Sequence, residues 1–247
     1  MRLHVPPAGL AGGRASLTRQ DSAYLLRVLR LKAGDRLQLF DGIGGAYPAE
    51  VVALGAEGGE LRLLGPREVD VDRAVAVSLW QGLPKGEKME WVIQKATELG
   101  VAEIVPLRCA RSVAQLAGDR MGRKLERWQK VAVEAARQCG RSDVPQLRPP
   151  AAPEALWALA RSGTPVILLH DGGQLPLARA LAELGEIPRL ALAVGPEGGF
   201  DPEEVRGAKE AGVRLVGLGK RVLRTETAAI VACALVAGWA GDFEPAL

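Results

Sequence analysis

Short apolar segments alternate with amphipathic helical segments from residue 74 onward, and this alternation constrains the fold more than any other feature. The apolar segments are AVAVSLW (74–80), EIVPL (103–107), PVILLH (165–170), RLALAV (189–194) and RLVGL (214–218). Continuous apolar strands joined by helices are typical of a parallel sheet that is covered on both faces. The pattern therefore predicts an α/β domain over residues 74–247.

The helical segments between these strands carry recognisable start and stop signals. In residues 89–100, the apolar residues recur at helical spacing and Gly100 is a natural C-terminal stop. In residues 201–212, Asp201, Pro202 and Glu204 form a capping-box pattern. Further helices are predicted within 175–184, within 227–239 and in the basic segment around Trp128, which we interpret as a core residue of its helix.

Residues 1–70 have a different character. LQLFD, AYPAEVVALG and ELRLLG read as short strands separated by glycine-rich turns, which predicts a small barrel or sandwich. SAYLLRVLR (22–30), just before them, has one apolar stripe and predicts a helix. REVDVDR (67–73) reads as the connection between the two domains.

Composition narrows the possible environments. The chain of 247 residues is 48% hydrophobic and 25% charged, which is a globular composition. The apolar tract 228–240 is too short to cross a bilayer, and MRLHVPPAGL lacks the apolar core of a secretory signal, so we expect a cytoplasmic protein without membrane contact. The three cysteines are far apart and lack metal-ligand spacing, so no metal site is expected.

The charge is unevenly distributed although the net value is only +3. Residues 1–36 carry seven cations against two acids, and residues 108–148 carry ten against four. Such segments suit a polyanionic partner, because phosphate contacts supply affinity that does not depend on sequence. They are equally compatible with two solvated faces.

Ligands of parallel α/β sheets bind beyond the carboxyl ends of the strands. Three stretches fall there: LLHDGG, GPEGGF (195–200) and GLGKRVLR (217–224). The glycines of GPEGGF allow a sharp turn and a close backbone approach to a ligand, although an ordinary strand-to-helix turn has the same composition. The dinucleotide fingerprint GxGxxG is absent from the start of this domain, and Arg221 stands where a P-loop needs serine or threonine.

Four long motifs occur in the order and approximate spacing of a known family. They are LPKGEKMEWVIQKATELGV, RWQKVAVEAARQCGR, GPEGGF and LGKRVLRTETA, and RVLR (27–30) and LQLFDG add to them. With these motifs the chain resembles the RsmE family, ribosomal RNA small-subunit uridine N3-methyltransferases of the SPOUT superfamily. The resemblance implies a PUA-like β-barrel over residues 1–70 and a SPOUT α/β-knot domain over 74–247, with a trefoil knot that general topology rules would not predict.

The same resemblance implies a function and its partners. The expected reaction is methylation of N3 of a specific uridine in the decoding region of 16S rRNA, in the assembled small subunit, with S-adenosylmethionine as the methyl donor and S-adenosylhomocysteine as the product. The enzyme is expected to act as a homodimer. Three alternatives are weighed: a ribose 2′-O methyltransferase of the same superfamily, a non-catalytic RNA-binding protein and a nucleotide-linked oxidoreductase, which the missing fingerprint disfavours.

The resemblance also assigns residues to the site. The expected cofactor residues are Leu169, His170, Gly195, Pro196, Glu197, Gly198, Gly199, Leu218, Gly219, Val222, Leu223 and Arg224. The expected catalytic residues are Arg224, Glu197 and Glu226, and the expected RNA-binding residues are Arg2, Arg27, Arg30, Lys85 and Arg141.

Alternatives stay open for several of these residues. Lys220, Arg221 and Arg224 would face the cofactor carboxylate or the RNA, but Arg224 could instead be tied to Glu226 or Glu197. Glu197 could simply hold its loop. His170 could cap or pack, and the cations around Trp128 could bind phosphates or border a dimer.

One position departs from the family pattern. Many members have histidine three residues before the arginine of RVLR, where this chain has Tyr24. Tyrosine keeps an aromatic ring and a polar tip but cannot become cationic near neutral pH. Any phosphate-binding or pH-sensitive role of the histidine is therefore not expected here.

Overall fold

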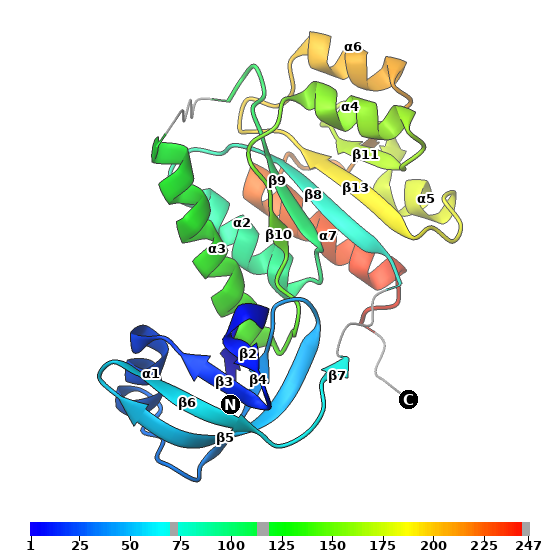
Figure 1. Cartoon of the computed structure of the whole chain (residues 1–247). Helices are drawn as coiled ribbons and strands as arrows, with labels where there is room; N and C mark the ends of the chain where they lie inside the picture. The colour runs from blue at the N-terminus through cyan, green and yellow to red at the C-terminus, as the bar shows by residue number, and fades with distance from the viewer. Residues whose placement is uncertain (70–73, 113–118, 244–247) are drawn as a thin grey trace. The chain divides into compact units, whose positions relative to one another are not determined.

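The computed structural model describes residues 1–69, 74–112 and 119–243, and its chain forms two compact units (Figure 1). Unit 1 consists of Met1–Asp72 together with Val133–Val144, and unit 2 consists of Arg73–Ala132 together with Pro145–Leu247. The sequence did not indicate that residues 133–144 belong with the N-terminal unit. Residues 70–73 of the predicted connection lie outside the described residues.

Unit 1 is built around one curved, mostly antiparallel sheet. Its strands are β1 (Arg2–His4), β2 (Leu10–Ala11), β3 (Arg14–Leu17), β4 (Arg36–Phe40), β5 (Gly45–Gly55), β6 (Gly58–Leu63) and β7 (Glu68–Val69). They pair in the order β1-β4-β5-β6-β3-β2, with β7 on β5, and only β1 and β4 run parallel. The three predicted strands are confirmed as β4, β5 and β6, whereas β1, β2 and β3 are too short to have shown a periodic signal.

A single apolar core holds unit 1 together. Helix α1 (Arg19–Arg27) buries Leu25 against Leu39 and Leu61 of the sheet, and a one-turn 3-10 helix, η1 (Pro7–Gly9), follows β1. Thr18 caps α1, because its side-chain oxygen accepts a hydrogen bond from the backbone N–H of Asp21 at 3.1 Å. The helix predicted within SAYLLRVLR is confirmed.

Unit 2 contains a parallel sheet, as predicted. Its strands are β8 (Ala76–Gly82), β9 (Glu103–Leu107), β10 (Gln146–Leu147), β11 (Val166–Leu169), β12 (Leu175–Pro176), β13 (Arg189–Val194) and β14 (Arg214–Gly217). They lie in the order β10-β9-β8-β13-β11-β14-β12, and neighbouring strands in this order run parallel. The carboxyl ends of β11, β13 and β14 therefore come together at one edge of the sheet.

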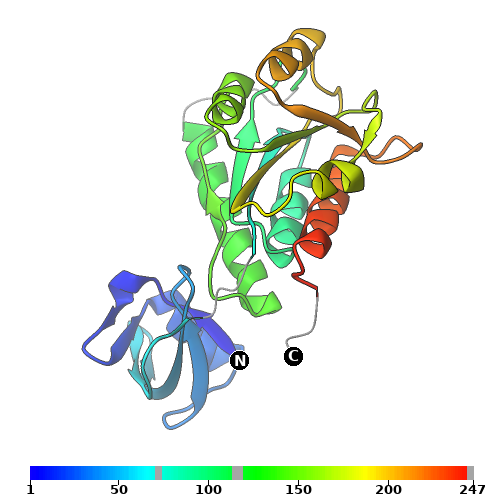
Figure 2. The same cartoon turned by 90° about the vertical axis from the view of Figure 1, so that its right-hand side faces the viewer.

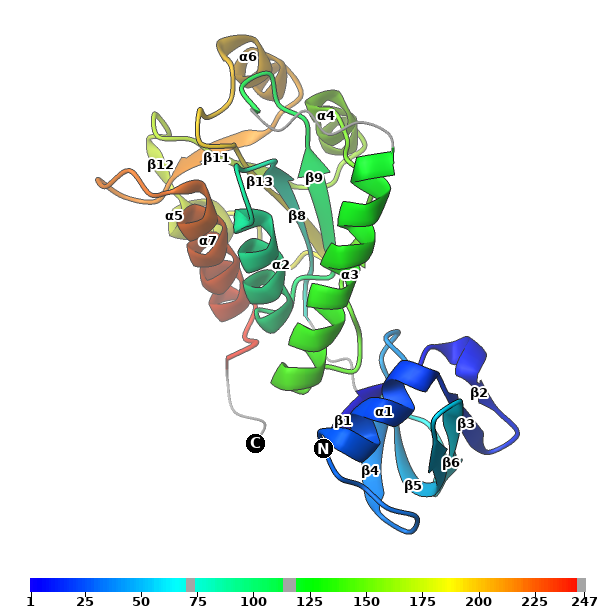
Figure 3. The same ribbon diagram turned by 90° about the vertical axis from the view of Figure 1, so that its left-hand side faces the viewer.

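Helices cover both faces of this sheet. They are α2 (Lys88–Glu98), α3 (Asp119–Cys139), α4 (Pro153–Arg161), α5 (Leu177–Ala182), α6 (Pro202–Glu210) and α7 (Thr225–Trp239). Helices α2 and α7 pack side by side on one face, and α4 and α6 pack together on the other (Figures 1 and 3). The capping box of α6 is formed as predicted, whereas α4 was not predicted.

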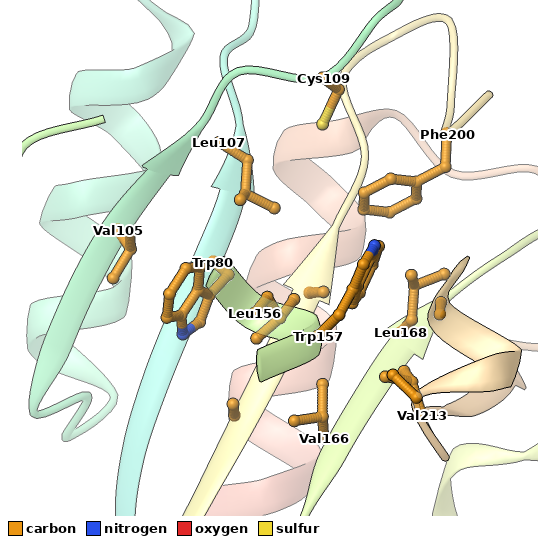
Figure 4. Packing of buried hydrophobic residues seen from close by; sticks show 14 residues of the cluster. Trp80, Val105, Leu107, Cys109, Leu156, Trp157, Val166, Leu168, Phe200 and Val213 are labelled. Carbon is orange, nitrogen blue, oxygen red and sulfur yellow. The ribbon is translucent and has the colours of Figure 1, made fainter. Parts of the chain in front are cut away.

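The core under α4 and α6 is closely packed (Figure 4). Trp157 of α4 lies beside Phe200, and both side chains are buried against β11 and β13. Burial of each large apolar side chain contributes about 1.5–3 kcal/mol. This layer anchors Phe200, the residue that ends the glycine-rich loop after β13. No helix within the described ranges is both long and apolar enough to cross a membrane.

Candidate active site

The loops that follow β11, β13 and β14 enclose one side of a cavity of about 580 Å³. The loop between β14 and α7 extends away from the rest of unit 2 (Figure 2), and its residues 218–224 line the cavity. All twelve residues that the resemblance assigns to cofactor binding line this cavity. The rule that places ligands at the carboxyl ends of parallel strands therefore pointed to loops that share one cavity.

The glycines of these loops serve two physical purposes. A Cβ atom on Gly195 would lie 3.1 Å from the carbonyl carbon of Gly199, and one on Gly82 would lie 2.4 Å from the backbone nitrogen of Pro196. Gly199 and Gly219 have φ angles of +68° and +98°, which side chains disfavour. The glycines thus allow the loops to pack on one another and turn sharply, which is how they shape the cavity.

A buried hydrogen-bond chain fixes the loop after β13 to helix α7. The hydroxyl of Thr225 donates to the carbonyl of Gly195 at 2.5 Å and accepts from Gln81 Nε2 at 2.8 Å. Gln81 Nε2 also donates to the carbonyl of Gly82 at 2.9 Å. Both side chains are buried, so these bonds hold three separate segments in one geometry. The sequence offered no local signal for this pairing of residues 144 positions apart.

Charged groups from α2, α7 and the glycine-rich loop meet beside the cavity: Lys88 and Glu197 line it, whereas Glu226 is not among the described residues that do. Lys88 Nζ donates to Glu197 Oε1 at 2.9 Å and lies 3.4 Å from Glu226 Oε2. The backbone N–H of Lys85 also donates to Glu197 Oε1, at 3.1 Å. Burial alone would raise the pKa of Glu197, but the hydrogen bonds from Lys88 and from backbone N–H groups outweigh it, so the pKa lies below its usual value.

The two acids differ in how fully they are satisfied. Glu226 Oε2 is buried and accepts no hydrogen bond from any described residue. The hypothesis that Arg224 is tied to Glu226 or Glu197 is not supported, because the described ion pairs of both acids are with Lys88. Sequence reasoning missed Lys88, although it follows the carboxyl end of β8 and the same edge rule could have indicated it.

The cations of the β14–α7 loop stay exposed at the cavity wall. Lys220, Arg221 and Arg224 all line the cavity, and Arg224 is the residue that precedes the first turn of α7. Val222 is 85% exposed, so its side chain has no enclosing partner within the described residues. The predicted cluster of cations is therefore accessible to an anionic ligand from outside.

Two other residues line the cavity, His170, which the sequence analysis predicted, and Arg111, which it did not. His170 Nδ1 accepts a hydrogen bond from the backbone N–H of Gly172 at 2.9 Å, which agrees with a capping role. Arg111, which sequence reasoning did not single out, donates to the carbonyl of Gly198 at 3.2 Å and approaches Asp201 at 3.5 Å. Arg111 follows β9, so it too lies at the carboxyl edge of the sheet.

The predicted RNA-binding residues fall into two groups. Arg27, Arg30 and Lys85 are at least partly exposed. Arg2 donates to Ser142 Oγ and stacks 5.3 Å from the centre of the Phe40 ring. Arg141 pairs with Asp143 at 2.7 Å, and its side chain is only 13% exposed. The last two arginines therefore already hold unit 1 together.

Tyr24, the departure from the family pattern, has a structural partner. Arg137 donates to the Tyr24 hydroxyl at 2.6 Å and lies 5.1 Å from the centre of its ring. A neutral hydroxyl suits this position, because a protonated histidine would repel the guanidinium. The contact joins α1 to the end of α3 within unit 1.

The described residues contain no cluster of three or more histidine, cysteine or acidic side chains that could hold a metal ion. The cavity is instead lined by glycine-rich loops, by Lys88 and Glu197, and by exposed cations of the β14–α7 loop, and Glu226 lies behind Lys88. Such a site can enclose a small organic ligand and present its reactive end to an anionic partner.

Comparison with known proteins identifies the family. Residues 72–237 match the model of an RNA methyltransferase domain, and residues 17–64 match that of an RNA methyltransferase PUA domain. The ribosomal RNA small subunit methyltransferase E of Synechocystis is 35% identical over 95% of this chain and 76% of its own length.

Solved structures agree with this match. The small subunit methyltransferase E of Neisseria gonorrhoeae, bound to S-adenosylmethionine, is 30% identical with a TM-score of 0.87 over 98% of both chains. A Legionella pneumophila methyltransferase with bound cofactor SAM is 32% identical with a TM-score of 0.84 over 96% of both chains. The chain therefore belongs to the ribosomal RNA small subunit methyltransferase E family, whose members are RNA methyltransferases.

Proposed function

We propose that the protein transfers a methyl group from S-adenosylmethionine to N3 of one uridine in the decoding region of 16S rRNA, within the assembled small subunit. The observation that carries the proposal is the cavity, which all three expected loops line in a chain of this family. The relatives solved with S-adenosylmethionine support the choice of cofactor. The proposed location is the cytoplasm, where ribosomal subunits assemble.

The cavity fits the proposed cofactor. Its volume of 580 Å³ lies within the range of about 300–1,000 Å³ typical of small-molecule sites. Leu169, Leu218 and Leu223 supply apolar wall for an adenosine, and Arg224 at the cavity wall suits the carboxylate of a methionyl group. The bound cofactor would supply a methyl group already activated by a sulfonium, so the chain has to align uracil N3 and take its proton.

The two acids suit different tasks in this reaction. Glu197 is held by Lys85 and Lys88, and its lowered pKa makes it a weaker base, which favours the loop-holding role. Glu226 retains a buried oxygen that accepts no hydrogen bond within the described residues. We therefore propose Glu226 as the acceptor of the N3 proton and Arg224 as the group that stabilises the uracil anion.

This division of roles has a direct test. Glu226→Gln is expected to lower the single-turnover methylation rate by about 10²–10⁴-fold while cofactor affinity stays within about twofold. Glu197→Gln is expected to weaken cofactor binding first, because it loosens the glycine-rich loop. Equal rates for wild type and Glu226→Gln at saturating cofactor would remove Glu226 from the mechanism.

RNA binding is proposed for the exposed cations. Arg27, Arg30 and Lys85 are accessible for phosphate contacts. Helix α3 adds a face formed by Arg120, Arg123, Lys124, Arg127 and Lys130, which recur at helical spacing. Of these, Arg127 is already paired with Glu87 and Glu90. The remaining cations suit a phosphate backbone.

A homodimer is proposed from exposed apolar side chains on the paired helices α2 and α7. Trp91 of α2 is 52% exposed and Leu235 of α7 is 43% exposed. Large apolar side chains on packed neighbouring helices are typical of an interface. Light scattering should give the mass of a dimer for the wild type and of a monomer for a Trp91→Glu, Leu235→Glu double variant.

The trefoil knot forms part of the same proposal. It is supported by the membership of the chain in this family, and the loop after β11 lies close to the end of β14: a Cβ atom on Gly173 would lie 2.4 Å from the carbonyl carbon of Val216. So close an approach of two backbone segments leaves room only for glycine at position 173.

The deciding experiment maps methylation in 30S particles that lack the modification. The purified protein is incubated with these particles, with and without S-adenosylmethionine, and the 16S rRNA is reverse-transcribed. Methylation at N3 blocks the Watson–Crick edge, so a new cofactor-dependent stop at one uridine is expected. Methyl incorporation without a stop would indicate ribose methylation, and no incorporation despite cofactor binding would indicate a non-catalytic RNA-binding protein.

A further inference from the structure

Lys88 joins two walls of the cavity through a single ammonium group. Its Nζ atom lies 2.9 Å from Glu197 Oε1 and 3.4 Å from Glu226 Oε2. Glu197 belongs to the glycine-rich loop after β13, Glu226 lies in the first turn of α7, and Lys88 is the first residue of α2. Three segments that are distant in the sequence thus meet at one charge.

The burial of these three groups distinguishes the cluster from a surface ion pair. The side chains of Lys88, Glu197 and Glu226 are 34%, 29% and 15% exposed, and Lys88 itself lines the cavity. Exposed ion pairs contribute little, because water and salt screen them. Here the partial burial strengthens both the attraction to Lys88 and the repulsion between the two carboxylates.

The geometry points to Lys88 as a positioning residue of the methyltransferase site: it holds the glycine-rich loop against the start of α7 by neutralising part of the charge of Glu197 and Glu226. This inference deepens the proposed function and rests on it. Without the ammonium, both carboxylates would lose the cation that they share, and the buried Oε2 of Glu226, which accepts no hydrogen bond within the described residues, would also lose its ion pair; the loop and the helix would then be held less firmly. The cavity between them would then fit its ligand less well.

The first measurement is the affinity for S-adenosylmethionine by calorimetry. Lys88→Met is expected to weaken binding by about tenfold or more, and Lys88→Arg is expected to restore most of it because the cation is kept. Lys95→Met is the matched control: Lys95 lies on the same helix and pairs with Glu98 at 2.9 Å, with similar exposure. Its affinity should equal that of the wild type.

A pH series separates positioning from a general loss of structure. Within the described residues, the charged side chain that contacts Glu197 is Lys88 from α2, and Glu226 from α7 approaches the same ammonium. In Lys88→Met, burial is no longer opposed by the ammonium, so the Glu197 pKa should rise and its protonation at low pH should relieve the repulsion. The affinity of Lys88→Met should therefore increase as the pH falls, while that of the wild type changes little over the same series.

A triple variant separates positioning from direct ligand contact. Lys88→Met combined with Glu197→Gln and Glu226→Gln removes the lysine and both carboxylate charges together. If Lys88 acts through the two acids, the triple variant binds S-adenosylmethionine more tightly than Lys88→Met alone. Affinity as low as in Lys88→Met would overturn the inference in favour of direct contact with the ligand.

The outcomes for the inference and for the proposed function are distinguishable. A wild type that does not bind S-adenosylmethionine would contradict the proposed cofactor. If the wild type binds S-adenosylmethionine and Lys88→Met binds it equally well at every pH, the role of Lys88 is overturned and the proposed function stays intact. Unfolding followed by tryptophan fluorescence identifies a variant that fails to fold, in which case Lys88→Gln replaces Lys88→Met.

Discussion

Replacement of Thr225 by valine would test the buried chain that fixes the glycine-rich loop. The Thr225 hydroxyl donates to the Gly195 carbonyl at 2.5 Å and accepts from Gln81 Nε2 at 2.8 Å. Valine has nearly the same shape as threonine, so Thr225→Val removes the hydroxyl without opening a cavity. The change therefore isolates the hydrogen bonds from the packing.

The expected cost follows from what each partner loses. The Gly195 carbonyl would be left buried without this donor, which costs about 1–3 kcal/mol. Gln81 Nε2 keeps its bond to the Gly82 carbonyl at 2.9 Å and loses only one net hydrogen bond, about 1 kcal/mol. The sum is about 3 kcal/mol, which corresponds to a decrease in Tm of ~6–12 °C for a unit of this size.

Tryptophan fluorescence can follow this unit alone. All five tryptophans of the chain lie in the segments of unit 2, and unit 1 has none. Thermal unfolding of the wild type, Thr225→Val and Thr225→Ser should then be compared. Serine keeps the hydroxyl and loses one methyl group, about 1 kcal/mol, so it should unfold between the other two.

Two results would refute the reasoning. Thr225→Val could unfold at or above the temperature of Thr225→Ser, which would mean that the hydroxyl adds no stability. Alternatively, Gln81→Met could cost as much in the Thr225→Val background as in the wild type, which would show that the two side chains are not coupled. We expect instead a coupling energy of about 1 kcal/mol.

Three further predictions concern the rest of the chain. Arg30 has a φ of +56°, which glycine adopts more readily than arginine. Arg30→Gly should therefore stabilise unit 1 by roughly 0.5–1 kcal/mol in denaturant unfolding and should weaken rRNA binding. Arg30→Ala should weaken rRNA binding without the gain in stability. Burial raises the pKa of Asp41, but hydrogen bonds from Gly45, Ile43, Arg67 and Tyr47 lower the pKa overall. The contribution of Asp41 to the stability of unit 1 is therefore present above about pH 4 and is lost as pH falls below that value. Hydrogen exchange at the Gly45 amide should accelerate at this pH, and Asp41→Asn should show no such pH-dependent acceleration. Three cations of α3, Arg120, Arg123 and Lys130, can be replaced together by glutamine. The plot of the logarithm of the rRNA binding constant against the logarithm of the salt concentration should then become less steep by ~0.7–0.9 for each phosphate that these cations neutralise. An unchanged slope would show that this face of α3 does not contact the RNA.

The sequence alone determined the elements whose signals are local. The apolar runs at 189–194 and 165–170 became neighbouring parallel strands, and the capping box at Asp201 opens α6. Trp128 is buried, as the stripe of its helix predicted. These features follow from periodicity, capping and turn chemistry, which depend on residues close together in the chain. The edge rule for parallel sheets then located the cavity from the order of strands and loops.

The partners of individual charges were decided only by the tertiary structure. Periodicity could not show that Lys88, rather than Arg224, meets Glu197 and Glu226, or that Arg141 pairs with Asp143 instead of staying exposed. Nor could it show that residues 133–144 join the N-terminal unit. A charged side chain interacts with whichever group the fold brings within a few ångströms. That proximity depends on strand order and loop packing, and residues adjacent in the sequence do not determine it.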